Sequence, residues 1–287
     1  MPLPKKLPPL AELAKETGDI VRAMRPYIIE QKDWEIKADG SPFTPADMAA
    51  HLHIKRRLAE LYPDKVVISE EDDKEEQKKA LIQANKDKDR FDTDPLDNTG
   101  GYISGYDGYS VNIGRITGGV PKEGAVYFPE KQELYYTENN KAYLKKGDRE
   151  PEEISVRGLP IRKPLQVAVG FNEQNAEYLE ERGLHKDEDY TLNAHPGQYR
   201  TCQIAAGKCD VSGINNGQRG GFDSWDTAGP HAVLRAAGGD FVTLDGQPMR
   251  YGDTTKLPPH IAGGVDTLKS LGLMDRQVEK AARVMGS

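Results

Sequence analysis

The sequence predicts a mixed α/β protein in which an α+β N-terminal half precedes an α/β C-terminal half. Residues 107–145 contain short β-branched and aromatic runs separated by Gly, Pro and Asn-Asn turns, which is typical of an antiparallel meander. From residue 165 onward, strand-like runs alternate with helical patterns, which indicates α/β topology. The charged, turn-rich segment 145–153 separates the two patterns. We therefore expect two domains, over 1–153 and 154–287.

The first two helices are predicted by apolar spacing and by a start signal. Residues 10–31 place apolar side chains at helical intervals. A second helix is expected to begin after Thr44, because Thr is a preferred N-cap, Pro45 suits the first helical position and Asp47 the third. It should run to about Leu61. Its expected apolar face consists of Met48, Leu52, Leu58 and Leu61.

Further elements follow from shorter patterns. Residues 65–69 (KVVIS) form a β-branched run that predicts a buried strand. The Lys- and Glu-rich stretch 72–89 is compatible with a solvated helix or with a mobile loop. In the C-terminal half we expect strands over 165–170, 209–214 and 240–244, and helices over 172–182, 197–207 and 226–237.

Composition restricts the class of protein. The net charge of −7 and the isoelectric point near 5.5 argue against a nucleic-acid-binding protein that depends on phosphate contacts. Cys202 and Cys209 are too few for a disulfide framework, so we expect buried thiols. No signal peptide and no membrane-spanning run is evident. A cytoplasmic protein is the expectation.

The segment DTDPLDNTGGY concentrates negative charge beside flexible backbone. A turn needs one Asp or Asn to bond its own backbone, whereas this one contains Asp92, Asp94 and Asp97. Hard divalent cations such as magnesium prefer oxygen ligands. Asp94 and Asp97 offer carboxylates, Leu96 a carbonyl and Thr99 a hydroxyl. The segment therefore predicts a cation site, with backbone N–H groups of 98–100 available to an anion.

Other acids lie at the ends of predicted elements, and each has a second interpretation. Asp47 stabilises a helix N-terminus in the simpler interpretation. Glu70 and Glu71 follow the predicted strand and would then be solvated. Asp226, in SWDTAGPHAV, would cap the helix that follows it. Taken one at a time, these simpler interpretations are favoured over metal ligation.

Four segments together resemble a known family. DPLDNT resembles the Asp-Pro-(Ile/Leu)-Asp-Gly-Thr signature of the lithium-sensitive, magnesium-dependent phosphomonoesterases, which include inositol monophosphatases and 3′(2′),5′-bisphosphate nucleotidases. DGSPFTPAD, ISEED and SWDTAGPHAVLRAAGG resemble three further motifs of that family, in the same order, over residues 37–240. The resemblance implies a layered αβαβα sugar-phosphatase-like fold, and coincidence does not account for all four motifs.

The resemblance also implies roles for individual residues. Two or three Mg²⁺ ions would be held by the side chains of Glu70, Asp94, Asp97 and Asp226 and by the Leu96 carbonyl. Glu71 would hold a water molecule beside the metal, while Asp47 and Thr99 would orient and activate the attacking water. Backbone N–H groups at Asn98, Thr99 and Gly100 would hold the phosphate.

This chain departs from the family pattern at specific positions. Asn98 replaces the family's glycine; Asn tolerates left-handed backbone, so the turn is expected to survive, with a side chain that crowds or hydrogen-bonds the phosphate. Asp92 is expected to be a surface charge, with an additional acid at the site as the alternative. Residues 194–210 replace the family's Gly-Ser segment, so substrate contacts there are expected to differ.

Among the subfamilies, the resemblance is greatest to the 3′(2′),5′-bisphosphate nucleotidases. It implies a phosphorylated small-molecule substrate, with removal of the 3′-phosphate of adenosine 3′,5′-bisphosphate or a related nucleotide. Arg200 would meet the second phosphate, unless it is a surface helix residue, and Arg219 lies in a substrate-facing loop or a flexible link. Inositol monophosphatase or another sugar-phosphate phosphatase is the alternative, and an inactive metal- and phospholigand-binding sensor is less favoured. The sequence allows a homodimer.

Overall fold

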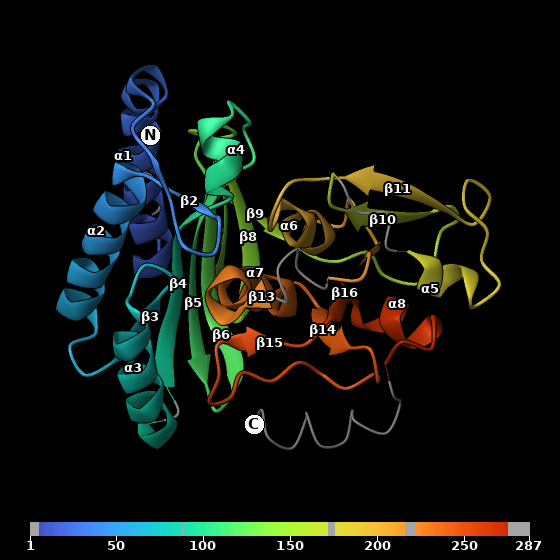
Figure 1. Ribbon diagram of the computed structural model, residues 1–287. Helices are drawn as coiled ribbons and strands as arrows, with labels where there is room; N and C mark the ends of the chain where they lie inside the picture. Colours follow the sequence, from blue (N-terminus) through green and yellow to red (C-terminus); the bar gives the residue numbers. More distant parts are fainter. Residues whose placement is uncertain (1–5, 88, 172–175, 216–221, 275–287) are drawn as a thin grey trace.

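The computed structural model describes residues 6–87, 89–171, 176–215 and 222–274 (Figure 1). Helices and sheets stack in five layers, so the predicted αβαβα order is confirmed. In stacking order, the layers are α1 (Pro9–Gln31) with α2 (Pro45–Leu61), a seven-stranded sheet, α6 (Tyr199–Ala205) with α7 (Ser224–Ala236), a five-stranded sheet, and α5 (Glu177–Glu180) with α8 (Val265–Ser270).

The seven-stranded sheet contains the predicted meander. Its strands in spatial order are β3 (Val66–Ser69), β4 (Asp89–Asp97), β5 (Ser110–Thr117), β6 (Val120–Phe128), β7 (Glu133–Glu138), β8 (Lys141–Lys146) and β9 (Glu152–Ile154). β3 pairs with β4 in parallel, and the other neighbours are antiparallel. Asn139 and Asn140 both have positive φ between β7 and β8, as the Asn-Asn turn predicts.

Strand β4 contains an irregularity that shapes the site. Asp94 pairs with Asn112 and Asp97 with Ser110, so three steps along β4 correspond to two along β5. Pro95 lies within this bulge, where its missing N–H removes one donor of the ladder. Bulges change the direction of side chains and end regular pairing. The irregularity therefore follows from the Asp-Pro sequence and separates the two aspartates on the strand.

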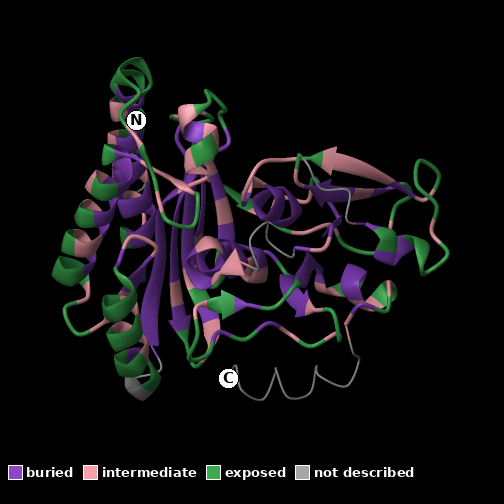
Figure 2. Cartoon of the chain, in the orientation of Figure 1, coloured by how far each residue is buried: buried purple, intermediate pink, exposed green. Residues whose placement is uncertain are grey.

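The second helix begins as predicted but buries a different face. The Thr44 hydroxyl and the Asp47 carboxylate form a capping box. Leu58 is buried, but Met48, Leu52 and Leu61 are exposed, so the expected apolar face is wrong. Small residues allow close packing against α1 instead, and the buried positions are Ala46, Asp47, Ala50, His51, Ile54 and Leu58. Figure 2 shows the exposed outer surfaces of α1 and α2.

Two further helices flank β4. α3 (Lys74–Asp87) forms within the Lys- and Glu-rich stretch, so the helical interpretation of 72–89 is confirmed. α4 (Thr99–Ile103) is a short helix directly after the acidic segment, with Asn98 at its N-cap. Two small antiparallel pairs complete this part of the fold, β1 (Glu35–Ile36) with β2 (Pro42–Phe43), and β13 (Phe222–Asp223) with β15 (Lys256–Leu257).

The five-stranded sheet agrees with the predicted α/β half in its main elements. Its spatial order is β11 (Tyr190–Ala194), β10 (Leu165–Val169), β12 (Val211–Ser212), β16 (His260–Gly264) and β14 (Gly239–Thr243). The strands β11 and β16 and the helix α8 are additional to the prediction. The expected helix over 172–182 is observed at α5, while 172–175 lie outside the described residues. The division into domains over 1–153 and 154–287 stays a prediction.

One expected surface charge is buried instead. Asp92 is fully buried and forms two hydrogen bonds with Arg90, at 2.8 and 3.1 Å. Arg90 also donates to the Gly252 carbonyl at 2.7 Å. The surface assignment of Asp92 is wrong because β4 is covered on both faces, by α2 and by α7, so its polar residues are paired inside the fold. Cys202 and Cys209 are buried and free, as expected.

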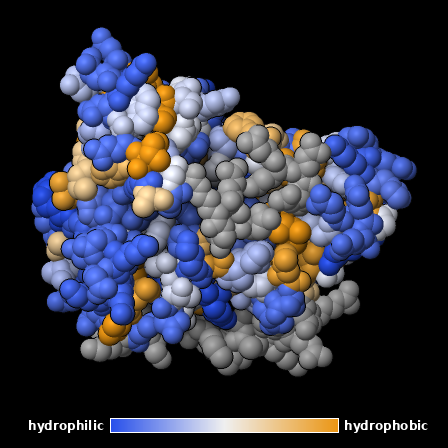
Figure 3. Space-filling view, viewed as in Figure 1, coloured by the Kyte–Doolittle hydropathy of each residue, from blue (hydrophilic) through white to orange (hydrophobic). Residues whose placement is uncertain are grey.

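The visible surface is mainly polar. Figure 3 shows a mostly hydrophilic face with scattered hydrophobic residues. Among the described residues, none of the helices combines the length and apolar character needed to span a membrane.

Candidate active site

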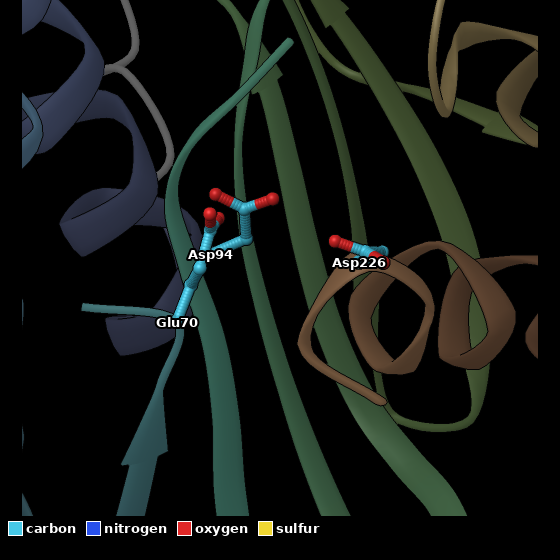
Figure 4. Close-up of side chains that lie close together, drawn as sticks. All are labelled: Glu70, Asp94 and Asp226. Carbon is cyan, nitrogen blue, oxygen red and sulfur yellow. The ribbon is translucent and has the colours of Figure 1, made fainter. Parts of the chain in front are cut away.

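Three carboxylates from distant parts of the chain converge between the seven-stranded sheet and α7. Figure 4 shows Glu70 at the end of β3, Asp94 on β4 and Asp226 in the first turn of α7. One carboxylate oxygen from each lies within 4.8 Å of the other two. Within the described part of the chain, this is the only such group of His, Cys, Asp or Glu residues.

Backbone pairing explains why Glu70 and Asp94 meet. The parallel pairing of β3 and β4 continues beyond Ser69, where the Glu70 N–H donates to the Thr93 carbonyl at 3.1 Å. Glu70 therefore lies beside the next residue of β4, Asp94. The Asp94 carboxylate also accepts the Leu96 N–H at 3.0 Å, which fixes it at the start of the bulge. Local backbone geometry thus brings two negative charges together.

Glycines determine how closely α7 approaches the sheet. A Cβ added at Gly229 would lie 2.8 Å from the Ile113 carbonyl oxygen. One added at Gly114 would lie 2.4 Å from the Ala228 backbone, and one at Gly124 would lie 2.4 Å from the Gly229 carbonyl. Helix and sheet are therefore in backbone contact. Asp226, one turn before Gly229, is held at the level of Asp94.

The electrostatics of this group disfavour three free charges. Burial, followed by the charges of Glu70, Asp97 and Asp226, raises the pKa of Asp94 well above its ordinary value. Burial, followed by the charges of Asp97 and Glu70, raises the pKa of Asp226 well above its ordinary value. Burial also raises the pKa of Glu70, although Lys37 opposes this. A bound cation would relieve this repulsion.

Asp97 lies outside the group of three, on the other side of the bulge. Its carboxylate accepts hydrogen bonds from the Ser110 hydroxyl at 3.2 Å and from the Gln198 backbone N–H at 3.4 Å. Burial raises the pKa of Asp97, while those hydrogen bonds lower it. Its charge still acts on Asp94 and Asp226. The role of Asp97 as a metal ligand stays a prediction, and sequence reasoning missed Ser110 and Gln198 as its partners.

Asp47 and Thr99 are in direct contact. The Thr99 hydroxyl lies 3.0 Å from Asp47 Oδ1 and 2.9 Å from the Leu96 carbonyl oxygen. Asp47 Oδ2 accepts from the Thr44 N–H and hydroxyl, both at 2.7 Å. Burial raises the pKa of Asp47 to about 6, against the opposing hydrogen bonds from Thr44. Asp47 therefore caps its helix and contacts Thr99 at the same time, so the two interpretations of this residue are compatible.

Glu71 follows Glu70, and the carboxylates of both residues pair with the same lysine. Lys37 Nζ is 3.2 Å from the Glu70 carboxylate and 2.7 Å from that of Glu71. Burial alone would lower the pKa of Lys37, but the two glutamates outweigh it and raise that pKa. Burial and the charge of Glu70 raise the pKa of Glu71. Sequence reasoning missed Lys37, although it lies just before the segment DGSPFTPAD.

Asn98 adopts the backbone expected of the glycine that it replaces. Its φ of 65° and ψ of 47° are left-handed, which confirms that the turn survives. Its side-chain oxygen accepts the Gly101 N–H at 3.3 Å, and its amide nitrogen lies 3.5 Å from the Gly108 carbonyl oxygen. The side chain thus caps α4. Gly100, in the first turn of α4, has open space around its Cα.

A cavity of about 390 Å³ opens beside this turn and contains Arg200. Its lining includes Asp97, Asn98, Gly100, Phe171 and His195. Arg200 is buried on α6, and its Nε donates to the Gly197 carbonyl at 3.1 Å. The surface interpretation of Arg200 is therefore wrong. Arg219 lies outside the described residues.

Comparisons with known proteins test the resemblance to a family. A model of the inositol monophosphatase family matches residues 7–277. A 3′(2′),5′-bisphosphate nucleotidase, CysQ of Escherichia coli strain K12, is 32% identical over 247 residues, spanning 84% of this chain and 92% of the relative. A fructose-1,6-bisphosphatase/inositol-1-monophosphatase of Aquifex aeolicus is 26% identical over 257 residues, spanning 87% and 89%.

A solved structure supports the same fold. CysQ from Bacteroides thetaiotaomicron, described as a bacterial member of the inositol monophosphatase family, superposes with a TM-score of 0.71 at 24% identity. The match covers 89% of this chain and 96% of that one. The chain therefore belongs to the inositol monophosphatase family and is a phosphoric monoester hydrolase.

Proposed function

We propose that this protein is a magnesium-dependent phosphatase that removes the 3′-phosphate of adenosine 3′,5′-bisphosphate or a related nucleotide. The observation that carries the proposal is the group of Glu70, Asp94 and Asp226 beside the Asp47–Thr99 pair. The nucleotide is favoured by the CysQ relatives, whose name specifies that activity, and by the buried Arg200 in the adjoining cavity.

The residues present fit a hard divalent cation. Glu70, Asp94 and Asp226 offer only carboxylate oxygens, and magnesium takes one or two carboxylates with the rest of its shell from water and phosphate. Burial, followed by the neighbouring negative charges, raises the pKa values of Asp94 and Asp226, and a cation would neutralise those charges. We assign further ligand roles to Asp97 and the Leu96 carbonyl, for two or three ions in total. When bound, such ions would activate water and stabilise the leaving oxygen.

The chain's own groups orient the reactants. Asp47, when ionised, accepts a hydrogen bond from the Thr99 hydroxyl, which leaves the Thr99 oxygen free to accept one from a water molecule. That water would then be oriented for attack on phosphorus. Glu71 would hold a second water, and Lys37 keeps both glutamates in place.

The substrate's two phosphates would be bound separately. Backbone N–H groups at Asn98, Thr99 and Gly100 would hold the phosphate that is cleaved. Arg200 would pair with the other phosphate through two parallel hydrogen bonds. Inositol monophosphatase activity is the second candidate, because the matched family model and the Aquifex relative carry that name. A cytoplasmic location, lithium sensitivity, a homodimer and the absence of a nucleic-acid partner stay predictions.

The experiment is phosphate release from adenosine 3′,5′-bisphosphate and from inositol 1-phosphate, each with magnesium and with excess chelator. We expect the nucleotide to be preferred, no turnover in chelator and inhibition by calcium. Asp226→Asn should abolish turnover, while Asp33→Asn, an exposed aspartate on a turn, should retain it. Preference for inositol 1-phosphate would favour the second candidate. Release from neither substrate would favour a ligand-binding sensor, and full turnover in chelator would contradict the metal assignment.

A further inference from the structure

The ring of Phe171, which lines the cavity, lies against the ring of Tyr106, and both rings remain exposed. The rings of Tyr106 and Phe171 have centroids 6.0 Å apart at an interplanar angle of 42°. Despite that contact, Tyr106 is 58% exposed and Phe171 is 59% exposed. Aromatic side chains normally contribute to stability by being buried. This pair therefore contributes little to the fold that holds it.

Tyr106 is held in place by its backbone. Its N–H donates to the Gly101 carbonyl at 2.9 Å, and its own carbonyl accepts from Nη2 of the buried Arg25 at 2.8 Å. A Cβ added at Gly108 would lie 2.0 Å from the Pro196 ring, so this loop is in close contact with a residue that lines the cavity. The exposed ring is thus carried by a well-anchored segment.

Phe171 connects the aromatic pair to the candidate active site. It follows β10 and lines the cavity that also contains Asp97, Asn98 and Arg200. Phe222 contributes another ring to the same cavity, with the Arg200 guanidinium 5.9 Å from its centroid. The lining of the cavity therefore combines charged side chains with aromatic rings.

We propose that Tyr106 and Phe171 form a stacking site for the purine base of the substrate, an inference that rests on the proposed nucleotide phosphatase activity. A nucleobase is planar and aromatic, and it stacks on such rings irrespective of its hydrogen-bonding pattern. The base would lie at the rim while the phosphates lie near Asn98 and Arg200. Inositol has a saturated ring that carries hydroxyl groups, so it gains little from this surface. The pair thus selects nucleotides over sugar phosphates.

The test is equilibrium binding by calorimetry, with the full chain and magnesium, of adenosine 5′-monophosphate and of ribose 5-phosphate. Released phosphate is measured at the end of each titration. The variants are Tyr106→Leu and Phe171→Leu, with Tyr27→Leu as a matched control because that tyrosine is 63% exposed on α1. Melting temperatures verify that the variants are folded.

We expect the parent to bind the nucleotide at least roughly tenfold more tightly than the ribose phosphate, and each cavity variant to lose about tenfold for the nucleotide alone. The control should bind both ligands like the parent. The fluorescence of the 2-aminopurine analogue should be quenched on binding to the parent, which provides evidence of stacking without a variant.

Equal affinity of the parent for the two ligands would overturn the stacking site, as would parental nucleotide affinity in both cavity variants. The proposed function is tested separately, by phosphate release from adenosine 3′,5′-bisphosphate. A parent that releases none contradicts that function, whereas the binding preference for a base is measured independently of turnover.

Discussion

The substitution Asp94→Asn tests whether the crowded acids exist for the sake of a cation. Asp94 is buried, and its carboxylate belongs to the group whose oxygens lie within 4.8 Å of one another. Asparagine has nearly the same shape and retains one oxygen. The substitution therefore removes one charge from the group with little change in packing.

The magnitude follows from Coulomb's law. Two unit charges 4.8 Å apart repel by about 3.5 kcal/mol at an effective dielectric constant of about 20. Asp94 has two such neighbours, but proton uptake, which the raised pKa of Asp94 reflects, limits the repulsion that the metal-free protein retains. We therefore expect Asp94→Asn to stabilise the metal-free fold by roughly 1–3 kcal/mol, or about 2–6 °C in melting temperature for a chain of this size.

The assay is a set of four melting curves, of parent and variant, each in chelator and in magnesium. At a magnesium concentration about 100 times its dissociation constant, the parent should gain about 2.7 kcal/mol. If the variant binds magnesium about 100-fold more weakly, it gains only about 0.4 kcal/mol. Adding the ion should thus reduce the stability of the variant relative to the parent by about 2.3 kcal/mol, the difference between the two gains, and the variant should be nearly inactive.

The reasoning also has a pH signature. A carboxylate with a raised folded-state pKa stabilises the fold when it is protonated, so this contribution is present below the unfolded-state pKa. It is lost as the pH rises through the folded-state pKa. The metal-free parent should therefore lose stability as the pH rises from about 4, and the Asp94→Asn variant should lose less. A variant that melts below the parent in chelator and gains as much from magnesium would refute the metal-site interpretation.

Four other outcomes are expected. Thr99→Ala should lower kcat by roughly 10²–10⁴-fold with little change in magnesium affinity; loss of both to the same degree would show that Thr99 acts through the metal. Arg200→Ala should lower kcat/KM roughly 10- to 100-fold for a bisphosphorylated nucleotide and much less for a monophosphate, and equal losses would remove Arg200 from phosphate binding. Because the pKa of Asp47 is raised to about 6 and its ionised form accepts from Thr99, kcat/KM should rise with pH and level off above about 6, or lower when a cation is bound. A pH–rate profile that falls between pH 5 and 7 is the opposite result. Gly229→Ala should destabilise the fold by about 1–3 kcal/mol, since its Cβ would meet β5 backbone, whereas Gly158→Ala has open space and should be near neutral in thermal melting; equal effects would contradict the close approach of α7.

The sequence allowed much of the site to be predicted, because the contributing residues lie in short local patterns. The capping box at Thr44 and Asp47 follows from Thr-Pro-x-Asp, and the left-handed turn at Asn98 follows from the tolerance of Asn. In contrast, Lys37, Ser110 and Gln198 contact the acids through tertiary proximity. No local pattern marks such contacts.

The elements that were missed have glycine-rich or polar sequences in buried places. Strand β16 contains Gly263 and Gly264, which are poor strand formers in isolation but are required where Leu268 and Val156 pack against them. The charge of Asp92 predicts an exposed side chain, but Asp92 is buried because it pairs with Arg90 in the same strand. The apolar face of α2 was misjudged because Ala46 and Ala50, rather than large residues, form its contact. In each case the burial of a residue depends on which other element packs against it, and the sequence of its own segment does not contain that information.

The backbone contact between α7 and the sheet limits how this site can diversify. The glycine contacts between α7 and the sheet hold Asp226 at the level of Asp94, and a larger side chain there would push apart backbone segments that are in contact. Glu70 differs, because it ends a strand, its side chain is 28% exposed and it pairs with Lys37. If the group binds a cation as proposed, substitutions around Glu70 would therefore change the ligand set with less disturbance of the fold than substitutions at Asp94 or Asp226. Selection for a different ion would leave its record in residues 35–43 and 70–72, not in the helix.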